Sequence, residues 1–400
     1  MSRIDDLIQE LCPDGVETYS LGKIEDEKLI KLGRGEVISK TDLAYFPGNF
    51  PVYSSSASAQ GEFGRYGKYM FDDERITWSI DGGGKFFYRP EHLYSVTNVS
   101  GWLKVLDSSR IMPKYLFYAL ISLWSTKTYN YTVKAHPSVI RNDYTLPLPP
   151  IEVQREIVSI LDKFTELEAE LEAELEARKK QFTHYRDSYY AISTNVSKEP
   201  LELVALSEIG SLRRGRRFVK DDIRSSGVSC IHYGEIYTKY GTVAHESFSF
   251  LDEELASKLR RAKYGDVIIA SAGETVEDIG KSVVWYGEND VVIHDACYVF
   301  TSDLDPKYCA YFFQSANFKN QIRKFIATSK VSAISLDNLG KVMVPVVPLA
   351  DQIFISSTLN KLENLVLSAE SGIPAEIAAR RKQYEYYRDK LLTFKELKSA

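Results

Sequence analysis

Residues 146–190 read LPLPPIEVQREIVSILDKFTELEAELEAELEARKKQFTHYRDSYY and decide the fold. Three prolines open the stretch, and neither proline nor glycine follows within it. Apolar residues then recur mostly three or four positions apart, at Ile157, Ile160, Leu161, Phe164, Leu167, Leu171, Leu175, Phe182, Tyr185 and Tyr189. This spacing predicts one face of a long helix, and the prolines stop any helix upstream.

The same stretch recurs later in the chain. Pro348–Gln352 repeats Pro150–Gln154 at an offset of 198, and Ala379–Asp389 repeats Ala177–Asp187 at an offset of 202. In the first copy Glu-Leu-Glu-Ala, a run of good helix formers, occurs three times between residues 166 and 177. The second copy carries four more residues, most simply at 371–374, where Gly372 and Pro374 predict a joint between two helices. The chain is therefore an internal repeat.

Length and composition predict a multidomain globular protein. A chain of 400 residues exceeds what one core usually serves. The formal net charge of −5 does not indicate nucleic-acid binding, so local charge must carry any such prediction. Residues 151–199 hold 11 acids against 7 bases, whereas residues 213–224 hold 6 bases against 2 acids. The average conceals a basic segment.

The cysteines indicate a reducing compartment, and the N-terminus indicates that the chain is not exported. Four scattered cysteines without a CxxC pair predict neither a disulfide framework nor a zinc site. The first ten residues carry Arg3, Asp5, Asp6 and Glu10 and are no signal peptide, and no apolar run reaches the ~20 residues of a membrane span. We expect a cytoplasmic protein without membrane contact and without a metal site.

The chain order predicts an α+β fold with a pseudo-two-fold internal repeat. Two mixed α/β domains, 1–148 (with a short N-terminal helix at 2–11) and 200–347, alternate with long spacer helices at 149–199 and 348–400, expected to pair as an antiparallel coiled coil. Leu32–Lys40 and Leu212–Lys220 share framework positions at an offset of 180. Short β-type runs between glycines and prolines predict strands at 50–53, 69–71, 75–80, 86–88, 266–271, 280–285 and 291–293. Proline at the first turn predicts helices at 113–123 and 306–313.

Together these features resemble the specificity (S) subunit of type I restriction–modification systems. The resemblance covers essentially the whole chain. It rests on Cys12–Glu17, on Leu146–Gln154, on the Glu-Leu-Glu-Ala repeats, and on the Arg-Lys-Lys-Gln…Tyr-Arg-Asp signature with its closing copy at 380–388.

The resemblance implies a function and a set of partners. It implies two target recognition domains, each reading one half of a split site in double-stranded DNA, and paired helices that set the gap. It also implies two methyltransferase (M) subunits docked on the helices and restriction (R) subunits outside them. S-adenosylmethionine, ATP and Mg would belong to those subunits, with no cofactor in this chain. Four residues add ~6 Å to a helix, which is on the order of one or two base pairs.

Candidate DNA-binding residues are basic or small polar side chains in loops. Arg213–Arg217 is the strongest signal, because arginine clamps phosphates or pairs with guanine; a solvated basic loop is the alternative. For the remaining candidates, ordinary loop solvation stays an equal alternative. The predicted set is Arg34, Lys40, Ser54, Ser55, Gln60, Lys85, Lys134, His136, Arg213, Arg214, Arg216, Arg217, His232, Tyr233 and Lys330.

Six residues of the helix signatures are predicted to dock helices or methyltransferase subunits, with coiled-coil core as the alternative. They are Gln154, Tyr185, Arg186, Gln352, Tyr387 and Arg388.

Three classes of function remain open at this stage. The leading hypothesis is a non-catalytic DNA-specificity subunit, and the second is a helical scaffold whose α/β domains bind proteins. A stand-alone nuclease or methyltransferase is the third. It is disfavoured because the chain lacks an amino-methyltransferase (Asn/Asp)-Pro-Pro-(Tyr/Phe) motif and a phosphate loop.

Overall fold

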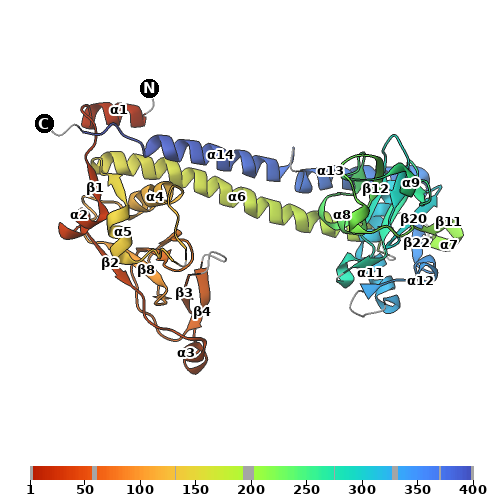
Figure 1. Cartoon of the computed structure of the whole chain (residues 1–400), viewed down its shortest axis with the longest axis horizontal. Helices are drawn as coiled ribbons and strands as arrows, with labels where there is room; N and C mark the ends of the chain where they lie inside the picture. Colours follow the sequence, from red (N-terminus) through yellow and green to blue (C-terminus); the bar gives the residue numbers. More distant parts are fainter. Residues whose placement is uncertain are drawn as a thin grey trace. The chain divides into compact units, whose positions relative to one another are not determined.

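The protein, seen in a computed structural model, divides into two compact units (Figure 1). The structure describes residues 3–55, 61–130, 132–191, 202–273, 275–326, 332–368 and 371–397. Unit 1 comprises Met1–Glu170 with Ala378–Ala400, and unit 2 comprises Leu171–Ile377. Helix α6 (Ile151–Tyr189) is continuous and contributes to both units. Within the described ranges, no helix is long and apolar enough to cross a bilayer.

Unit 1 contains two sheets and a helical layer. The four-stranded antiparallel sheet has the order β2-β8-β5-β6, and the three-stranded sheet has the order β4-β3-β7. Their strands are β2 (Ile30–Arg34), β3 (Phe50–Tyr53), β4 (Glu62–Tyr66), β5 (Arg75–Ser79), β6 (Phe86–Arg89), β7 (Ser95–Val96) and β8 (Ser100–Val105). A further pair joins β1 (Thr18–Ser20) to β9 (Thr145–Pro147). The helices besides α6 are α1 (Arg3–Leu11), α2 (Leu21–Asp26), α3 (Lys40–Tyr45), α4 (Pro113–Trp124), α5 (Pro137–Asp143) and most of α14 (Ile373–Leu391).

Unit 2 repeats this plan with larger sheets. A five-stranded sheet has the order β11-β20-β16-β18-β13, and a four-stranded sheet has the order β14-β12-β19-β15. The strands are β10 (Glu202–Ala205), β11 (Gly210–Arg214), β12 (Val228–Ile231), β13 (Val243–Ala244), β14 (Ser249–Leu251), β15 (Arg261–Ala262), β16 (Val267–Ala270), β17 (Ala272–Gly273), β18 (Ser282–Trp285), β19 (Val291–Ile293), β20 (Cys297–Ser302), β21 (Ser332–Ala333) and β22 (Met343–Val346). Its helices include α7 (Leu206–Ile209), α8 (Tyr233–Thr238), α9 (Glu253–Ala256), α10 (Pro306–Gln314), α11 (Ala316–Ile322), α12 (Leu336–Gly340) and α13 (Leu349–Leu367).

The internal repeat is visible in the strand pairing. In unit 1, β8 lies between β2 and β5, and β3 pairs with β7 in parallel. In unit 2, β20 lies between β11 and β16, and β12 pairs with β19 in parallel. The two domains are therefore the same framework, as the sequence offset predicts.

The spacer helices pack antiparallel within unit 1. The Phe164 ring of α6 stacks on Tyr387 of α14 (Ile373–Leu391) at 5.5 Å. One turn later on α6, Glu168 pairs with Arg381, 2.6 Å away and earlier on α14. Positions rise along α6 while they fall along α14, so the predicted antiparallel pairing is confirmed.

The joint in the second spacer is also confirmed. Helix α13 ends at Leu367 and α14 begins at Ile373. A Cβ on Gly372 would lie 2.7 Å from the carbonyl oxygens of both Asn364 and Leu365, so the chain can fold back on the end of α13 only at a glycine.

Most predicted strands and helices are present, with one exception. Residues 69–71 form no strand, because Phe71 makes only an isolated bridge with Tyr94. The Phe71 ring instead lies edge-on to Trp102 and under the guanidinium of Arg75. The aromatic side chain that suggested a strand instead packs against the side chains of the neighbouring sheet.

Candidate nucleic-acid interface

One backbone frame occurs at the same place in both domains. In unit 1, Arg34 ends β2 and its Nε donates to the Asn98 carbonyl in the loop between β7 and β8. In unit 2, Arg214 ends β11 and its Nε donates to the Asp295 carbonyl, 2.8 Å away, in the loop between β19 and β20. Each arginine thus fastens the equivalent loop.

The glycine after each arginine permits this close approach. A Cβ on Gly35 would lie 2.3 Å from the Val96 and Thr97 carbonyl oxygens. A Cβ on Gly215 would lie 2.1 Å from the carbonyl oxygen of His294. Only glycine fits at both positions, which explains the Gly-after-Arg pattern shared at an offset of 180.

The side chains that line the frame differ between the two domains. Thr97 donates its hydroxyl to Ser54 at 2.9 Å in unit 1. At the matching place in unit 2, the His232 and His294 rings lie 4.5 Å apart. The strand register also matches Ser55 with Tyr233 and Ser100 with Cys297. Hydroxyls thus line the frame in unit 1, and imidazole and aromatic rings line it in unit 2.

Several predicted residues of unit 1 meet at this frame. The Ser79 hydroxyl donates to the Ser55 carbonyl at 3.0 Å and accepts from the backbone of the Asp81–Lys85 turn. Lys134 pairs with Asp81 at 2.9 Å. The structure therefore brings Ser54, Ser55 and Lys134 together around one turn.

The other predicted residues of unit 1 have different surroundings. Lys85 is half-buried at the end of the turn, with its ammonium 5.5 Å from the Phe87 ring. His136 precedes α5 at the N-cap position without capping it through its side chain. Lys40 is exposed as the first residue of α3. Gln60 and, in the second domain, Lys330 lie outside the described residues.

The four arginines of residues 213–217 have different environments. Arg213 pairs with the buried carboxylate of Asp266 at 3.1 Å, and Arg216 donates to the Lys258 carbonyl at 2.7 Å. Arg214 holds the loop described above. Among the four, only exposed Arg217 has no hydrogen bond to another described residue. Arg217 is therefore the arginine most available to a phosphate.

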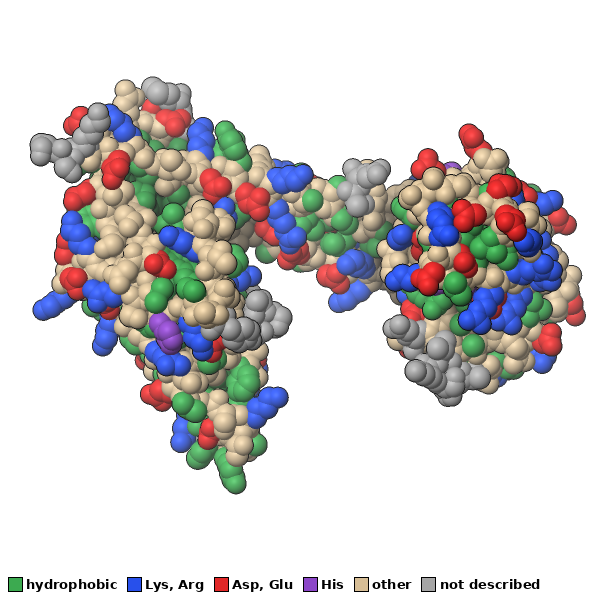
Figure 2. All heavy atoms as spheres, viewed as in Figure 1, with side chains coloured by type: hydrophobic (Ala, Val, Ile, Leu, Met, Phe, Trp, Pro, Cys, Tyr) green, Lys and Arg blue, Asp and Glu red, His purple; other side chains and the backbone are tan. Residues whose placement is uncertain are grey.

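A second basic segment escaped the sequence analysis. Arg260 donates to the Arg214 carbonyl at 2.7 Å, which brings residues 258–263 alongside residues 213–217. Figure 2 shows Lys and Arg side chains gathered on unit 2 over the region of β11 and β20. The sequence KLRRAK at 258–263 carried the same signal as the first segment. His294 had no signal beyond its equivalence to Thr97, which only strand pairing reveals.

The two histidines of the frame are neutral at neutral pH. Burial lowers the pKa of His232. Burial, reinforced by the neighbouring His232, lowers the pKa of His294 to about 4. Neutral imidazoles offer one donor and one acceptor each, which suits hydrogen bonding and not phosphate neutralisation.

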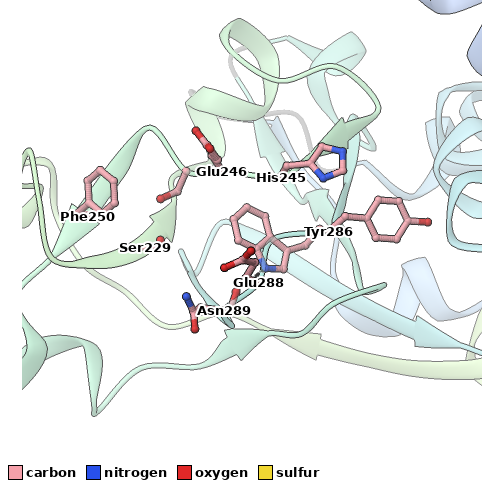
Figure 3. Close-up of a pocket in the computed structure, with 9 residues that line it drawn as sticks. Ser229, His245, Glu246, Phe250, Tyr286, Glu288 and Asn289 are labelled. Atoms are coloured by element: carbon pink, nitrogen blue, oxygen red, sulfur yellow. Dashed lines mark hydrogen bonds between the residues drawn. The ribbon is translucent and has the colours of Figure 1, made fainter.

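One cavity of unit 2 has the wrong charge for DNA. It measures about 620 Å³ and is lined by His245, Glu246, Glu288 and Asn289 among others. Figure 3 shows the Glu246, Glu288 and Asn289 side chains around this hollow. Carboxylates repel phosphates, so the basic surface is the better candidate interface.

Two predicted docking residues are buried in their own domains. Gln154 accepts from the Met112 backbone N–H at 2.9 Å and donates to the Pro149 carbonyl at 2.8 Å. Gln352 makes the same pair of bonds, accepting from Asp305 at 2.9 Å and donating to Val347 at 2.7 Å. Both amides therefore join a spacer helix to its own domain and offer no surface to a second protein.

The Tyr-Arg-Asp signatures lie at the opposite helix ends. Asp187 accepts from the Ala316 N–H at 3.0 Å, and Asp389 accepts from the Ser122 hydroxyl at 3.0 Å. Arg186 and Arg388 pair with these aspartates. The rings of Tyr185 and Tyr387 are partly exposed, at 42% and 36%. The aspartates thus fasten each helix end to a domain, while the tyrosines remain accessible.

Comparison with known families gives one clear result. The model of the type I restriction modification DNA specificity domain matches the chain twice, at residues 13–177 and 198–379. The chain belongs to the type I specificity-subunit family. No three-residue cluster of His, Cys, Asp or Glu that could hold a metal occurs in the described part of this specificity subunit.

Relatives in sequence and structure agree with the family. A putative type I restriction enzyme specificity subunit of Haemophilus influenzae is 29% identical over 370 residues, covering 88% of this chain and 87% of the relative. The EcoR124I/EcoR124II specificity subunit of Escherichia coli is 29% identical and covers 72% of each chain.

Solved structures share the fold. The type I S subunit from M. genitalium covers 94% of this chain and 96% of its own, with a TM-score of 0.53 and 15% identity. A chain from a structural study of complex assembly in the type I system covers 95% and 98%, with a TM-score of 0.61 and 16% identity.

Proposed function

We propose that this specificity subunit recognises a split site in double-stranded DNA, with each domain reading one half. The observation that carries the proposal is the frame of Arg34 and Arg214, built twice on the same hydrogen bond from an arginine Nε to a loop carbonyl but lined differently. Side chains on one frame meet base edges at the same depth, so different linings select different bases. Two half-sites of unlike sequence are therefore expected.

Phosphate contacts would position the duplex on unit 2. Arg216, Arg217 and Arg260 are exposed cations next to the frame. Such contacts supply affinity without reading sequence and make binding weaken steeply as salt rises. The alternative, a scaffold that binds proteins, predicts DNA affinity that is absent or insensitive to salt.

The partners follow from the same proposal. Two methyltransferase subunits would dock on the helices, where Tyr185 and Tyr387 keep exposed ring surface, with restriction subunits outside them. S-adenosylmethionine, ATP and Mg would be bound by those subunits. This chain would contribute recognition and spacing, and no catalytic group.

Genome-wide adenine methylation tests the proposal. The host is compared with a strain that lacks this gene and with the same strain carrying the gene on a plasmid. A split methylated motif should disappear on deletion and return on complementation. If methylation is identical in all three strains while the methyltransferase genes are expressed, the proposed function is wrong.

A further inference from the structure

Unit 2 contains a cavity of about 260 Å³ between its recognition domain and its helices. Three cations from three elements line it: Arg186 of α6, Lys281 just before β18, and Lys319 of α11. This cavity differs from the acidic hollow in Figure 3, because it is lined by three cations and a single carboxylate, Glu363.

The carboxylates near this cavity are already engaged. Asp187 pairs with Arg186 at 3.1 Å and also accepts from the Ala316 N–H. Asp278 pairs with Lys281 at 3.0 Å. Glu363 accepts from the hydroxyls of Thr242 and Tyr311 at 2.5 and 2.7 Å. Because these three carboxylates already have partners, none of them pairs with Lys319.

Lys319 is the cation with the weakest compensation. Among the described residues its ammonium donates only to a neutral acceptor, the Glu277 carbonyl oxygen, at 2.7 Å. Burial lowers the pKa of Lys319 and the charges of Lys281 and Arg186 lower it further, while the carboxylates of Glu277 and Asp278 oppose this shift only in part. An anion between these cations would offset both the desolvation and the repulsion.

We propose that Arg186, Lys281 and Lys319 form a binding site for a phosphate group. Lysine and arginine side chains bind phosphate in proteins, and here three of them line one cavity.

The position of the cavity favours a phosphate of the DNA backbone. Helix α8 begins at the N-cap His232, in the candidate interface, and its Tyr237 lines the cavity. The five positions from His232 to Tyr237 span about 7.5 Å of helix, roughly two base-pair steps. The cavity would therefore contact the duplex beside the half-site that unit 2 reads. The assignment of this phosphate to the DNA backbone rests on the proposed function, whereas phosphate binding by the cavity does not.

The first measurement is the affinity of the full chain for a duplex carrying its methylated motif, between 50 and 200 mM salt. Lys319→Met keeps the side-chain length and removes the charge. The slope of log affinity against log salt concentration should become shallower by about 0.9. Between 50 and 200 mM salt, the affinity of the variant should therefore fall by a factor about threefold smaller than that of the wild type. Lys361→Met removes an exposed lysine of α13 outside the cavity and should leave the slope unchanged.

The second measurement tests whether the cavity binds free phosphate instead of a phosphate of the DNA backbone. Inorganic phosphate, compared with chloride at equal ionic strength, should raise the Tm of the wild type and not of Lys319→Met. If the salt slope is unchanged but this Tm effect depends on Lys319, the site takes a free phosphate. If Lys319→Met proves unstable, Lys281→Met replaces it in both measurements. If neither variant alters the slope or the phosphate effect, the proposal is wrong.

These outcomes are separable from a failure of the proposed function. A wild-type chain whose DNA affinity is absent or does not depend on salt would contradict DNA recognition itself. The phosphate measurement on the melting temperature would still decide whether the cavity binds phosphate.

Discussion

Single residues show how one frame tolerates two sequences. In unit 1, Trp78 of β5 donates to the Ala135 carbonyl at 2.7 Å and faces Gly101 of β8. In unit 2 the aromatic residue is on the other strand, since Tyr298 of β20 donates to the Ile334 carbonyl at 2.9 Å and faces Ile269. A sequence comparison of the two domains cannot find this equivalence, because the aromatic residue is on β5 in unit 1 and on β20, the partner of the equivalent strand, in unit 2.

Two neighbouring arginines should behave differently when truncated. Arg217→Ala removes an exposed cation without a hydrogen bond to a described residue, so stability should change by less than about 0.5 kcal/mol. Its DNA affinity should fall, with a salt slope lower by about 0.9. Arg213→Ala leaves the buried Asp266 carboxylate without its cation and should cost about 1–2 kcal/mol. Urea denaturation measures the stability of both variants, and DNA binding at several salt concentrations measures the salt slope. Equal stability losses in the two variants would contradict these assignments.

The histidine pair predicts a dependence of stability on pH. The folded state holds the pKa of His294 at about 4, below its unfolded value, so between pH 6.5 and 4 the unfolded chain binds more protons. The free energy of unfolding should therefore fall as pH falls through this window. In His294→Gln the decrease should be smaller. Urea titrations at several pH values check this, and parallel curves for the two proteins would refute it.

Whole elements were more predictable than their contacts. Gly372 and Pro374 break the helical pattern, so the joint between α13 and α14 follows from local chemistry. The pairing of Arg213 with Asp266 joins residues far apart in sequence and could not be predicted. Gln154 and Gln352 stood out as a repeated signature, yet only the fold shows that their amides are buried, at 0% and 3% exposure.

These glutamines should act as structural ties between helix and domain. Gln154→Ala removes a buried amide and leaves the Met112 N–H without its acceptor, which should cost about 2–4 kcal/mol. Gln352→Ala should cost a similar amount in unit 2, and the two losses should add because the sites lie in separate units. Arg155→Ala, at an exposed position one residue further along α6, is the control. Urea denaturation is the measurement, and a loss no larger than that of the control would contradict the assigned role.

At the scale of the whole molecule, the two domains are one framework used twice, joined by helices of defined length. Helix α6 is continuous through the three Glu-Leu-Glu-Ala units. Two antiparallel contacts with α14, Phe164 on Tyr387 and Glu168 with Arg381, precede the second of these units. Changing the number of units should therefore alter spacing and leave both recognition frames intact.

The methylated motif of a shortened chain tests the central claim most directly. Deletion of residues 170–173 removes about 6 Å of helix, so the gap should shorten by about one or two base pairs while both half-sites keep their sequence. Leu171→Ala keeps the length and should leave the gap unchanged. If the deletion variant directs methylation of the original motif, or if its half-sites change, the result would contradict the claim that the domains recognise the half-sites and the helices set the gap.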